Sequence, residues 1–259
     1  MKSVQVLGVR IDDVSLYGAV DIVKGWLDSD KKGAGRYIVT PNPEFLMLAR
    51  RDREFKELLN ESDLSIPDGS GLLLSGRVKN TTTGVDLMEE LCRLSGDCGF
   101  TVGLLGGKDG VAEKTKQCLL KKYPKLKIVF AESGPIISET GEVLSSKYYG
   151  KEKIQDPLIQ NTYPFPQVDI LFIALGQGKQ ERWISQNLSK SEARVMMGVG
   201  GAFDYLSGEV KRAPLLIRKI RFEWLFRLIT QPWRIKRQLA LFQFIFLVIK
   251  ERLFGSVKI

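Results

Sequence analysis

The run Val168–Leu175, VDILFIAL, constrains the fold most, because all but one of its residues are apolar. Such a strand is normally buried on both faces, as in a parallel sheet that helices cover on each side. Strand-like and helical patterns alternate over residues 1–208, so we predict an α/β fold with a mostly parallel sheet flanked by helices. The other strands are expected at Val4–Ile11, Arg36–Thr40, Asp63–Ile66, Phe100–Leu105, Leu126–Ala131 and Arg194–Val199. The helices are expected at Val14–Leu27, Glu44–Leu59, Asp86–Leu94, Gly110–Lys122 and Gln180–Leu188.

Charge divides the chain into two parts. Residues 1–208 contain 27 basic and 27 acidic residues, whereas residues 209–259 contain 12 and 3, so the net charge of +9 lies in the last 51 residues. We therefore predict a core over 1–208 and a basic appendage over 209–259. The appendage should form two amphipathic helices, Pro214–Ile229 and Pro232–Phe254. Its most apolar stretch, Leu239–Ile249, is shorter than the roughly 20 residues that span a bilayer.

Three roles of the appendage are open at this point: a homo-oligomer interface, a helical cap on the sheet, and an interfacial membrane anchor. Basic residues interleave with tryptophan and phenylalanine, which favours the anchor, because both kinds of side chain lie at the level of lipid headgroups. An anionic membrane surface is therefore the predicted partner. A non-enzymatic, nucleic-acid-binding protein is the alternative, but the basic residues accompany a bulky apolar face and no RNA-binding signature is present.

The chain contains no histidine. This excludes a Ser-His-Asp triad and any His-ligated metal, so a general base must be Asp, Glu, Lys, Tyr or Cys. Asp28 and Asp30 form a DxD pattern, but they follow a predicted helix, and we expect no metal. Three cysteines without CxxC spacing, and an N-terminus without the apolar core of a secretory signal, predict a cytoplasmic protein.

Polar segments follow five of the predicted strands, and four of these segments are rich in glycine. Because the carboxyl ends of parallel strands meet at one edge of a sheet, these segments should together form a site. Asp68 lies in Pro-Asp-Gly, a common turn sequence. In a chain without histidine it is also the natural base for a sugar hydroxyl. The segments are Thr40–Pro43, Pro67–Gly71, Gly106–Gly110, Gly176–Glu181 and Gly200–Asp204.

The segment Gly106–Gly110 follows a strand and opens a helix, and the next strand ends near Glu132. This order is similar to a dinucleotide-binding fingerprint, although a full match would need glycine at Leu105. A helix N-terminus binds any phosphate, so a nucleotide diphosphate fits as well as NAD. A nicotinamide-dependent oxidoreductase is therefore the enzymatic alternative.

Seven motifs, in order along nearly the whole chain, resemble the WecG/TagA/CpsF family of glycosyltransferases. The segments Gly-Lys-Gln-Glu and Glu-Trp-Leu-x-Arg are the most specific of them. The motifs are Thr40-x-Asn42, Pro67-Asp68-Gly69-x-Gly71, Thr83–Leu87, Gly176-x-x-Lys179-Gln180-Glu181-x-Trp183, Gly198–Asp204, Gly208-x-x-x-Arg212-Ala213-Pro214, and Glu223–Arg237 with its tryptophan, arginines and proline.

The resemblance implies an inverting, metal-independent transfer of an N-acetylmannosamine-type sugar from a UDP-sugar to an undecaprenyl-diphosphate-linked sugar, in teichoic acid or exopolysaccharide synthesis. It implies a Rossmann-like core, an appendage that contacts the inner face of the cell membrane, and no cofactor. Asp68 would be the general base, with Thr40 and Gln180 also catalytic. The predicted substrate-binding residues are Asn42, Lys179, Asp204, Arg227, Arg234 and Arg237 in the family motifs, and Gly106 and Gly107 in the phosphate-binding pattern described above.

The sequence departs from the family pattern in three places. Thr81 stands where many members have arginine, and Gly178 replaces the proline that usually precedes Lys-Gln-Glu. The predicted loop Gly150–Gln167 is longer than usual. These departures bear on the identity of the sugar more than on the type of reaction.

Overall fold

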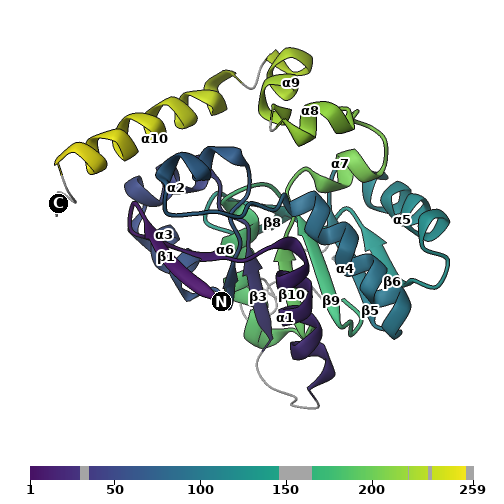
Figure 1. The fold of residues 1–259 in the computed structure, drawn as a ribbon. Coiled ribbons are helices and arrows are strands. Elements are labelled where there is room, and N and C mark those ends of the chain that lie inside the picture. The colour runs from purple at the N-terminus through teal and green to yellow at the C-terminus, as the bar shows by residue number, and fades with distance from the viewer. Residues whose placement is uncertain (30–34, 146–164, 221, 233–234, 255–259) are drawn as a thin grey trace.

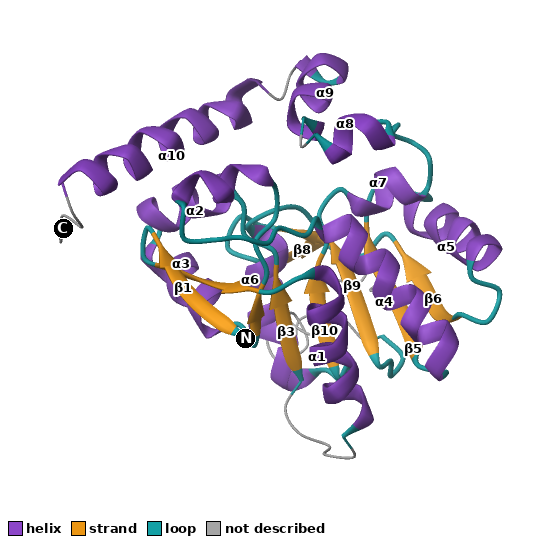
Figure 2. Ribbon diagram, in the orientation of Figure 1, coloured by secondary structure: helices purple, strands orange, loops and turns teal. Residues whose placement is uncertain are grey.

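The structure, a computed structural model, describes residues 1–29, 35–145, 165–220, 222–232 and 235–254. Its centre is a six-stranded, all-parallel sheet with helices on both faces, as predicted (Figure 2). The strand order is β4-β3-β10-β9-β5-β6. The strands are β3 (Arg36–Val39), β4 (Leu64–Ser65), β5 (Thr101–Gly106), β6 (Lys127–Glu132), β9 (Ile170–Ala174) and β10 (Val195–Gly198).

Each strand of the sheet sends alternate side chains into two separate cores. Met196 of β10 packs on one face, whereas Val195 and Met197 pack on the other. All five residues of β9 are buried, which confirms the expectation drawn from VDILFIAL. One face is covered by α2 (Pro43–Arg51), α3 (Arg53–Glu61) and α6 (Lys179–Asn187), and the other by α1 (Leu16–Asp28), α4 (Gly84–Cys98), α5 (Val111–Lys122) and α7 (Ala202–Leu206).

The prediction of a single strand over Val4–Ile11 is wrong. The segment forms a separate antiparallel hairpin of β1 (Lys2–Val6) and β2 (Val9–Asp13), outside the main sheet. Leu7 and Gly8 form its two-residue turn, with φ angles of 49° and 80°. Positive φ at both turn positions matches the right-handed twist of the two strands.

Two predicted helices are each divided in the structure. The helix expected over Glu44–Leu59 is interrupted at Asp52, which ends α2 and caps α3 by accepting a hydrogen bond from the Phe55 amide, 2.8 Å away. The helix expected over Pro214–Ile229 becomes α8 (Leu215–Lys219) and α9 (Glu223–Thr230). The Phe222 amide donates to the Ile217 carbonyl, five residues back, and this bond ends the first of them.

Four short elements complete the description. A second antiparallel hairpin, β7 (Ile136–Ile137) and β8 (Val143–Ser145), was not predicted. The 3-10 helices are η1 (Ser70–Ser75), directly after Asp68, and η3 (Leu188–Lys190). Most of the loop predicted at Gly150–Gln167, residues 150–164, lies outside the described residues.

The appendage ends in the long helix α10 (Ile235–Phe254), which packs on α2 and η1. Phe244 and Val248 are buried in the same core as α2 and α3. Figure 1 shows α8, α9 and α10 arranged in line across one end of the sheet, the end at which α2 and α7 lie. Among the described residues, no helix is both long and apolar enough to cross a membrane.

Candidate active site

The loop that carries Asp68 is held by two backbone hydrogen bonds, one to the segment after β3 and one to the segment before α4. The Asp68 amide donates to the Pro41 carbonyl at 2.8 Å, and the Thr82 amide donates to the Pro67 carbonyl at 2.9 Å. Helix α4 then begins at Gly84, with Thr83 as its N-cap. The segments after β3 and β4 therefore meet at the N-terminus of α4, as the strand-end pattern predicted.

The Asp68 carboxyl is surrounded by protein, although part of the residue stays open to solvent. Burial raises the pKa of Asp68 to about 7, because the charged form loses hydration. The positive charge of Arg227 and a hydrogen bond from the Gly84 amide oppose this shift, whereas Glu223 and Asp86 add to it. The result is a carboxyl that exchanges its proton near neutral pH.

Thr40 follows β3 directly and is buried. A Cβ atom placed on Gly84 would lie 3.4 Å from the Thr40 hydroxyl oxygen, so the hydroxyl and the start of α4 are neighbours. The Asn42 side-chain oxygen caps α2, because it accepts from the Glu44 and Phe45 amides at 3.0 and 3.1 Å. Only the amide nitrogen of Asn42 is then left for a substrate.

Gln180 is held in a buried polar network. Its side-chain oxygen accepts from the Gly200 amide at 3.1 Å, and its side-chain nitrogen donates to Glu181 at 2.7 Å. The other oxygen of Glu181 accepts from the Gly178 amide at 2.7 Å. Both polar atoms of Gln180 have partners, so this residue joins the Gly176–Glu181 loop to the Gly200–Asp204 loop.

The residues Gly106 and Gly107 form the turn between β5 and α5. The φ angle of Gly106 is +114°, and a Cβ atom there would lie 2.5 Å from the Ala174 carbonyl carbon. The Gly107 amide donates to the Ala174 carbonyl at 2.8 Å. Glycine is thus required where the turn meets β9. Lys179 extends from the start of α6 and pairs with Glu139 at 2.7 Å.

Arg227 of α9 enters the site from the appendage. Its guanidinium lies over the Tyr205 ring, 4.8 Å from the centroid. A Cβ atom on Gly201 would lie 3.6 Å from a terminal nitrogen of Arg227 and 3.5 Å from an Asp204 oxygen. The Nε atom of Arg227 is buried and makes no hydrogen bond to the described chain. Sequence reasoning did not identify Tyr205, the aromatic partner of this cation.

Arg212 is a second residue whose importance became clear only in the structure. Its guanidinium makes two parallel hydrogen bonds to the Asp86 carboxylate, at 2.7 and 2.9 Å, and a third to Glu223 at 3.2 Å. A fourth bond, to the Thr83 hydroxyl at 3.1 Å, reaches the N-cap of α4. Arg212 therefore ties the appendage to the helix start that faces Asp68. The motif Arg212-Ala-Pro was the feature of the sequence that could have identified this residue.

The remaining predicted residues are not tested by this geometry. Arg234 lies outside the described residues, and so does the side chain of Arg237. Of the two residues of the DxD pattern, Asp30 lies outside the described residues, and Asp28 pairs with Lys24 at the end of α1. Within the part of the chain that the structure describes, no group of three or more acidic or cysteine side chains could hold a metal ion. A cavity of about 290 Å³ is lined in part by Tyr205, Arg212 and Arg218, and Asp68 is not among its lining residues.

Comparison with known proteins gives a consistent result. The model of the family described as "Glycosyl transferase WecG/TagA/CpsF family" matches residues 4–258. Similar curated proteins include the N-acetylglucosaminyldiphosphoundecaprenol N-acetyl-beta-D-mannosaminyltransferases of Staphylococcus aureus strains MRSA252 and NCTC 8325 / PS 47. Each is 28% identical over 254 residues, which cover 96% of this chain and 93% of the relative.

Proposed function

Because this chain belongs to the WecG/TagA/CpsF family and is therefore a glycosyltransferase, we propose that it moves an N-acetylmannosamine-type sugar from a UDP-sugar to a sugar on undecaprenyl diphosphate. Two similar curated proteins carry the name of that reaction. The product would enter the synthesis of a cell-surface polysaccharide such as teichoic acid. Inversion at the anomeric carbon and independence of metal are parts of the proposal.

The first requirement of this reaction is a base for the acceptor hydroxyl. As the acceptor oxygen forms its bond to the anomeric carbon, the bond to UDP breaks and the hydroxyl proton passes to the Asp68 carboxylate. A base with a pKa of about 7 is deprotonated in a large fraction of molecules at neutral pH and still accepts a proton readily. The single observation that supports this role most is the placement of the buried Asp68 carboxyl after β4, where it accepts a hydrogen bond from the Gly84 amide at the start of α4, next to Thr40.

The second requirement is positive charge for the departing UDP. The amide groups at the N-terminus of α5, which follows the Gly106–Gly107 turn, would receive phosphate oxygens. Arg227 would add a full positive charge. Its Nε atom is buried and has no hydrogen bond in the described chain, so the guanidinium keeps a donor for the departing group. These groups stand in for the divalent cation that many nucleotide-sugar enzymes use.

The third requirement is access to a lipid-linked acceptor. The appendage lies across the end of the sheet that carries Asp68, and α8 and α10 expose many large apolar side chains. These helices would lie on the anionic inner face of the cell membrane, at the depth of the acceptor diphosphate. Arg234 and Arg237 are proposed to bind that diphosphate together with Arg227.

A defined acceptor assay tests the proposal. The full-length protein is incubated with a short-chain N-acetylglucosaminyl diphosphate lipid and, separately, with UDP-N-acetylmannosamine, UDP-N-acetylglucosamine and UDP-glucose. We expect a single N-acetylhexosamine to be added from the first donor, as mass spectrometry will show, with UDP released in equal amount. Transfer from none of the donors would refute the proposed function. Anomeric coupling constants of the product test inversion.

A nicotinamide-dependent activity is not supported by the family assignment. Glu132 does stand opposite Leu105 in the β5–β6 pair, as a ribose-binding carboxylate would. The same turn serves a nucleoside diphosphate equally well, because its amides recognise phosphate rather than nicotinamide. Thermal stabilisation by UDP but not by NAD would separate the two interpretations.

A further inference from the structure

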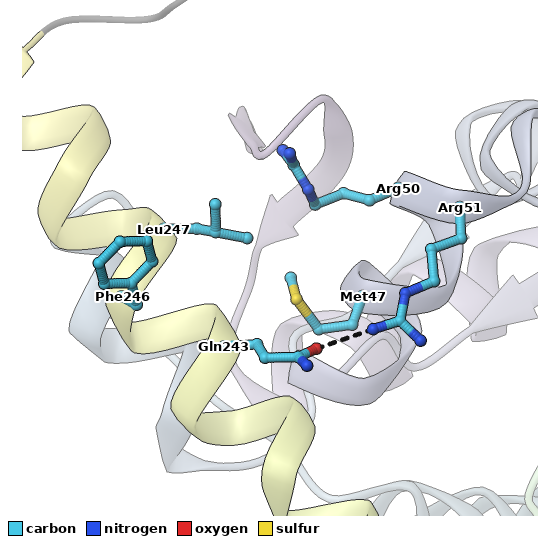
Figure 3. A pocket seen from close by; sticks show the side chains of 6 residues that line it. All are labelled: Met47, Arg50, Arg51, Gln243, Phe246 and Leu247. Carbon is cyan, nitrogen blue, oxygen red and sulfur yellow. Dashed lines mark hydrogen bonds between the residues drawn. The ribbon is translucent and has the colours of Figure 1, made fainter.

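A groove between α2 and α10 is separate from the proposed active site. Its volume is about 350 Å³, and it is lined by three apolar and three polar side chains (Figure 3). The apolar ones are Met47, Phe246 and Leu247, and the polar ones are Arg50, Arg51 and Gln243. The two walls come from the core and the appendage, so the groove exists only when α10 is docked.

Helix α10 is a firmly packed wall of this groove. Phe244 is completely buried and Val248 is 4% exposed, on the side of α10 that faces the core. A Cβ atom on Gly71, three residues after Asp68, would lie 3.0 Å from Leu241. Burial of these two large side chains stabilises the docked position of α10.

The groove carries two guanidinium groups without an acidic partner among the described residues. Arg51 donates to the neutral side-chain oxygen of Gln243 at 3.0 Å, and no described side chain pairs with Arg50. By contrast, the nearby Arg53 pairs with Glu57 at 2.8 Å. Cations in the last turn of a helix are favourable without any ligand. Here they also border a cavity with an apolar wall, which is a suitable place for an anion with a hydrocarbon chain.

The apolar wall continues onto an exposed stripe of α10. Phe246 is 66% exposed and belongs to both the groove and the stripe. Successive members of the stripe are four and three residues apart, so they follow one face of the helix for about 27 Å. All six are at least 51% exposed: Ile235, Leu239, Phe242, Phe246, Ile249 and Leu253.

A second copy of the chain is a poorer occupant of this face. It would bring the same cations to Arg50 and Arg51. Helix α10 itself contains one acidic residue, Glu251, which already pairs with Arg77 at 3.3 Å. An anionic lipid supplies both the missing negative charge and an apolar chain, and guanidinium groups bind phosphate oxygens in a planar fork.

We infer that the α2–α10 groove binds one anionic phospholipid, with its phosphate at Arg50 and Arg51 and an acyl chain along Phe246 and Leu247. The inference rests on the membrane association in the proposed function and adds a defined lipid site to it. Arg50 lies eight residues from the N-cap Asn42, or about 12 Å along α2. A lipid bound there would set the depth of the active site relative to the headgroups.

The test uses the full-length protein and short-chain lipids below their critical micelle concentration. Dihexanoyl phosphatidylglycerol is expected to raise the melting temperature, whereas inorganic phosphate and dihexanoyl phosphatidylcholine at equal concentration are not. The double variant Arg50→Gln/Arg51→Gln should weaken binding of phosphatidylglycerol about tenfold or more, at about 1 kcal/mol per cation. The control Arg53→Gln/Arg93→Gln loses the same charge outside the groove and should change the affinity less than twofold.

Three results would overturn the inference. Equal stabilisation by inorganic phosphate would mean a simple anion site. Equal loss of affinity in the control variant would mean a diffuse charge effect. Light scattering that shows a dimer broken by Phe246→Ser would assign the face to a second copy. Transfer to the short-chain acceptor, measured on the same samples, should be unchanged in the groove variant. If no variant transfers sugar while the lipid response persists, the proposed function fails and the lipid site stands.

Discussion

Two buried carboxyl groups at the same edge of the sheet have similar acidity and very different surroundings. Burial raises the pKa of both Asp68 and Glu181 to about 7. Glu181 is 1% exposed, and each of its oxygens accepts a hydrogen bond from the chain. Asp68 keeps some exposure and has a cation, Arg227, near it. A shifted pKa therefore does not by itself identify a base.

The difference lies in what remains available to a substrate. The network of Glu181 and Gln180 uses its polar atoms to join two loops, so these residues hold the site in shape. The carboxyl of Asp68 accepts one amide hydrogen bond, from Gly84, and retains capacity for a further proton donor. On this basis we propose that Asp68 is the general base and that Glu181 holds the two loops in place, and the variants below test that division.

The largest effect is expected from Asp68→Asn. An amide of the same shape cannot take the acceptor proton, so turnover should fall by about 10² or more. The fold and the affinity for UDP should persist, which circular dichroism and thermal shift with UDP will check. Near-normal transfer by this variant would remove Asp68 from the mechanism.

A smaller loss, about 10- to 100-fold in turnover, is expected from Arg227→Ala, because one cation at the leaving group is lost. The positive charge of Arg227 also lowers the pKa of Asp68. Its removal should therefore shift the midpoint of the pH profile of kcat/KM to higher pH. Arg218→Ala is the matched control, because Arg218 lies in the same appendage and is not among the main causes of the shift in the pKa of Asp68. An unshifted midpoint in the Arg227 variant would contradict the action of the Arg227 charge on the Asp68 carboxyl.

Glu181→Gln should lower the free energy of unfolding by roughly 1–3 kcal/mol and turnover by no more than about tenfold. The new amide nitrogen must face either the Gly178 amide or the Gln180 side-chain nitrogen, both of which are donors. Because the folded-state pKa of Glu181 is raised, its contribution to stability is lost as pH rises through about 7. The difference in free energy of unfolding between the variant and the native chain, measured with urea, should thus be smaller above pH 7 than below it. A turnover loss as large as that of Asp68→Asn would contradict the division of roles.

The smallest effect is expected from removal of divalent cations. Arg227 and the amides of the turns supply the positive charge in this account, so EDTA should leave the transfer rate within about twofold of its value. Full loss of activity with recovery on addition of Mg²⁺ or Mn²⁺ would show that a metal carries part of that charge. Inductively coupled plasma analysis of the purified protein provides the control.

The sequence was sufficient for the sheet and for the clustering of the strand-end loops. Apolar runs such as VDILFIAL have one favourable environment, and the order of strands and helices then determines the edge at which the loops meet. The hairpin at Leu7-Gly8 was missed, because leucine rarely adopts a positive φ angle. The break at Asp52 was missed, because apolar residues keep a helical period across it.

The site could be predicted residue by residue only in part. The family motif predicts that Gln180 lies near the reaction centre, but its hydrogen bond from the Gly200 amide depends on where that loop returns in space. The same holds for Arg212, whose partner Asp86 is 126 positions away in sequence. Long-range pairs of this kind are set by tertiary packing, and local patterns contain no trace of them.

The most direct test of the account is the pH dependence of kcat/KM for sugar transfer by the native chain. A base with the pKa of Asp68 predicts that the rate rises about tenfold per pH unit below neutrality and is half-maximal at about pH 7. The rate should then stay level up to about pH 8.5. A profile that is flat from about pH 5.5 to about pH 8.5 would contradict the assignment of Asp68 as the base.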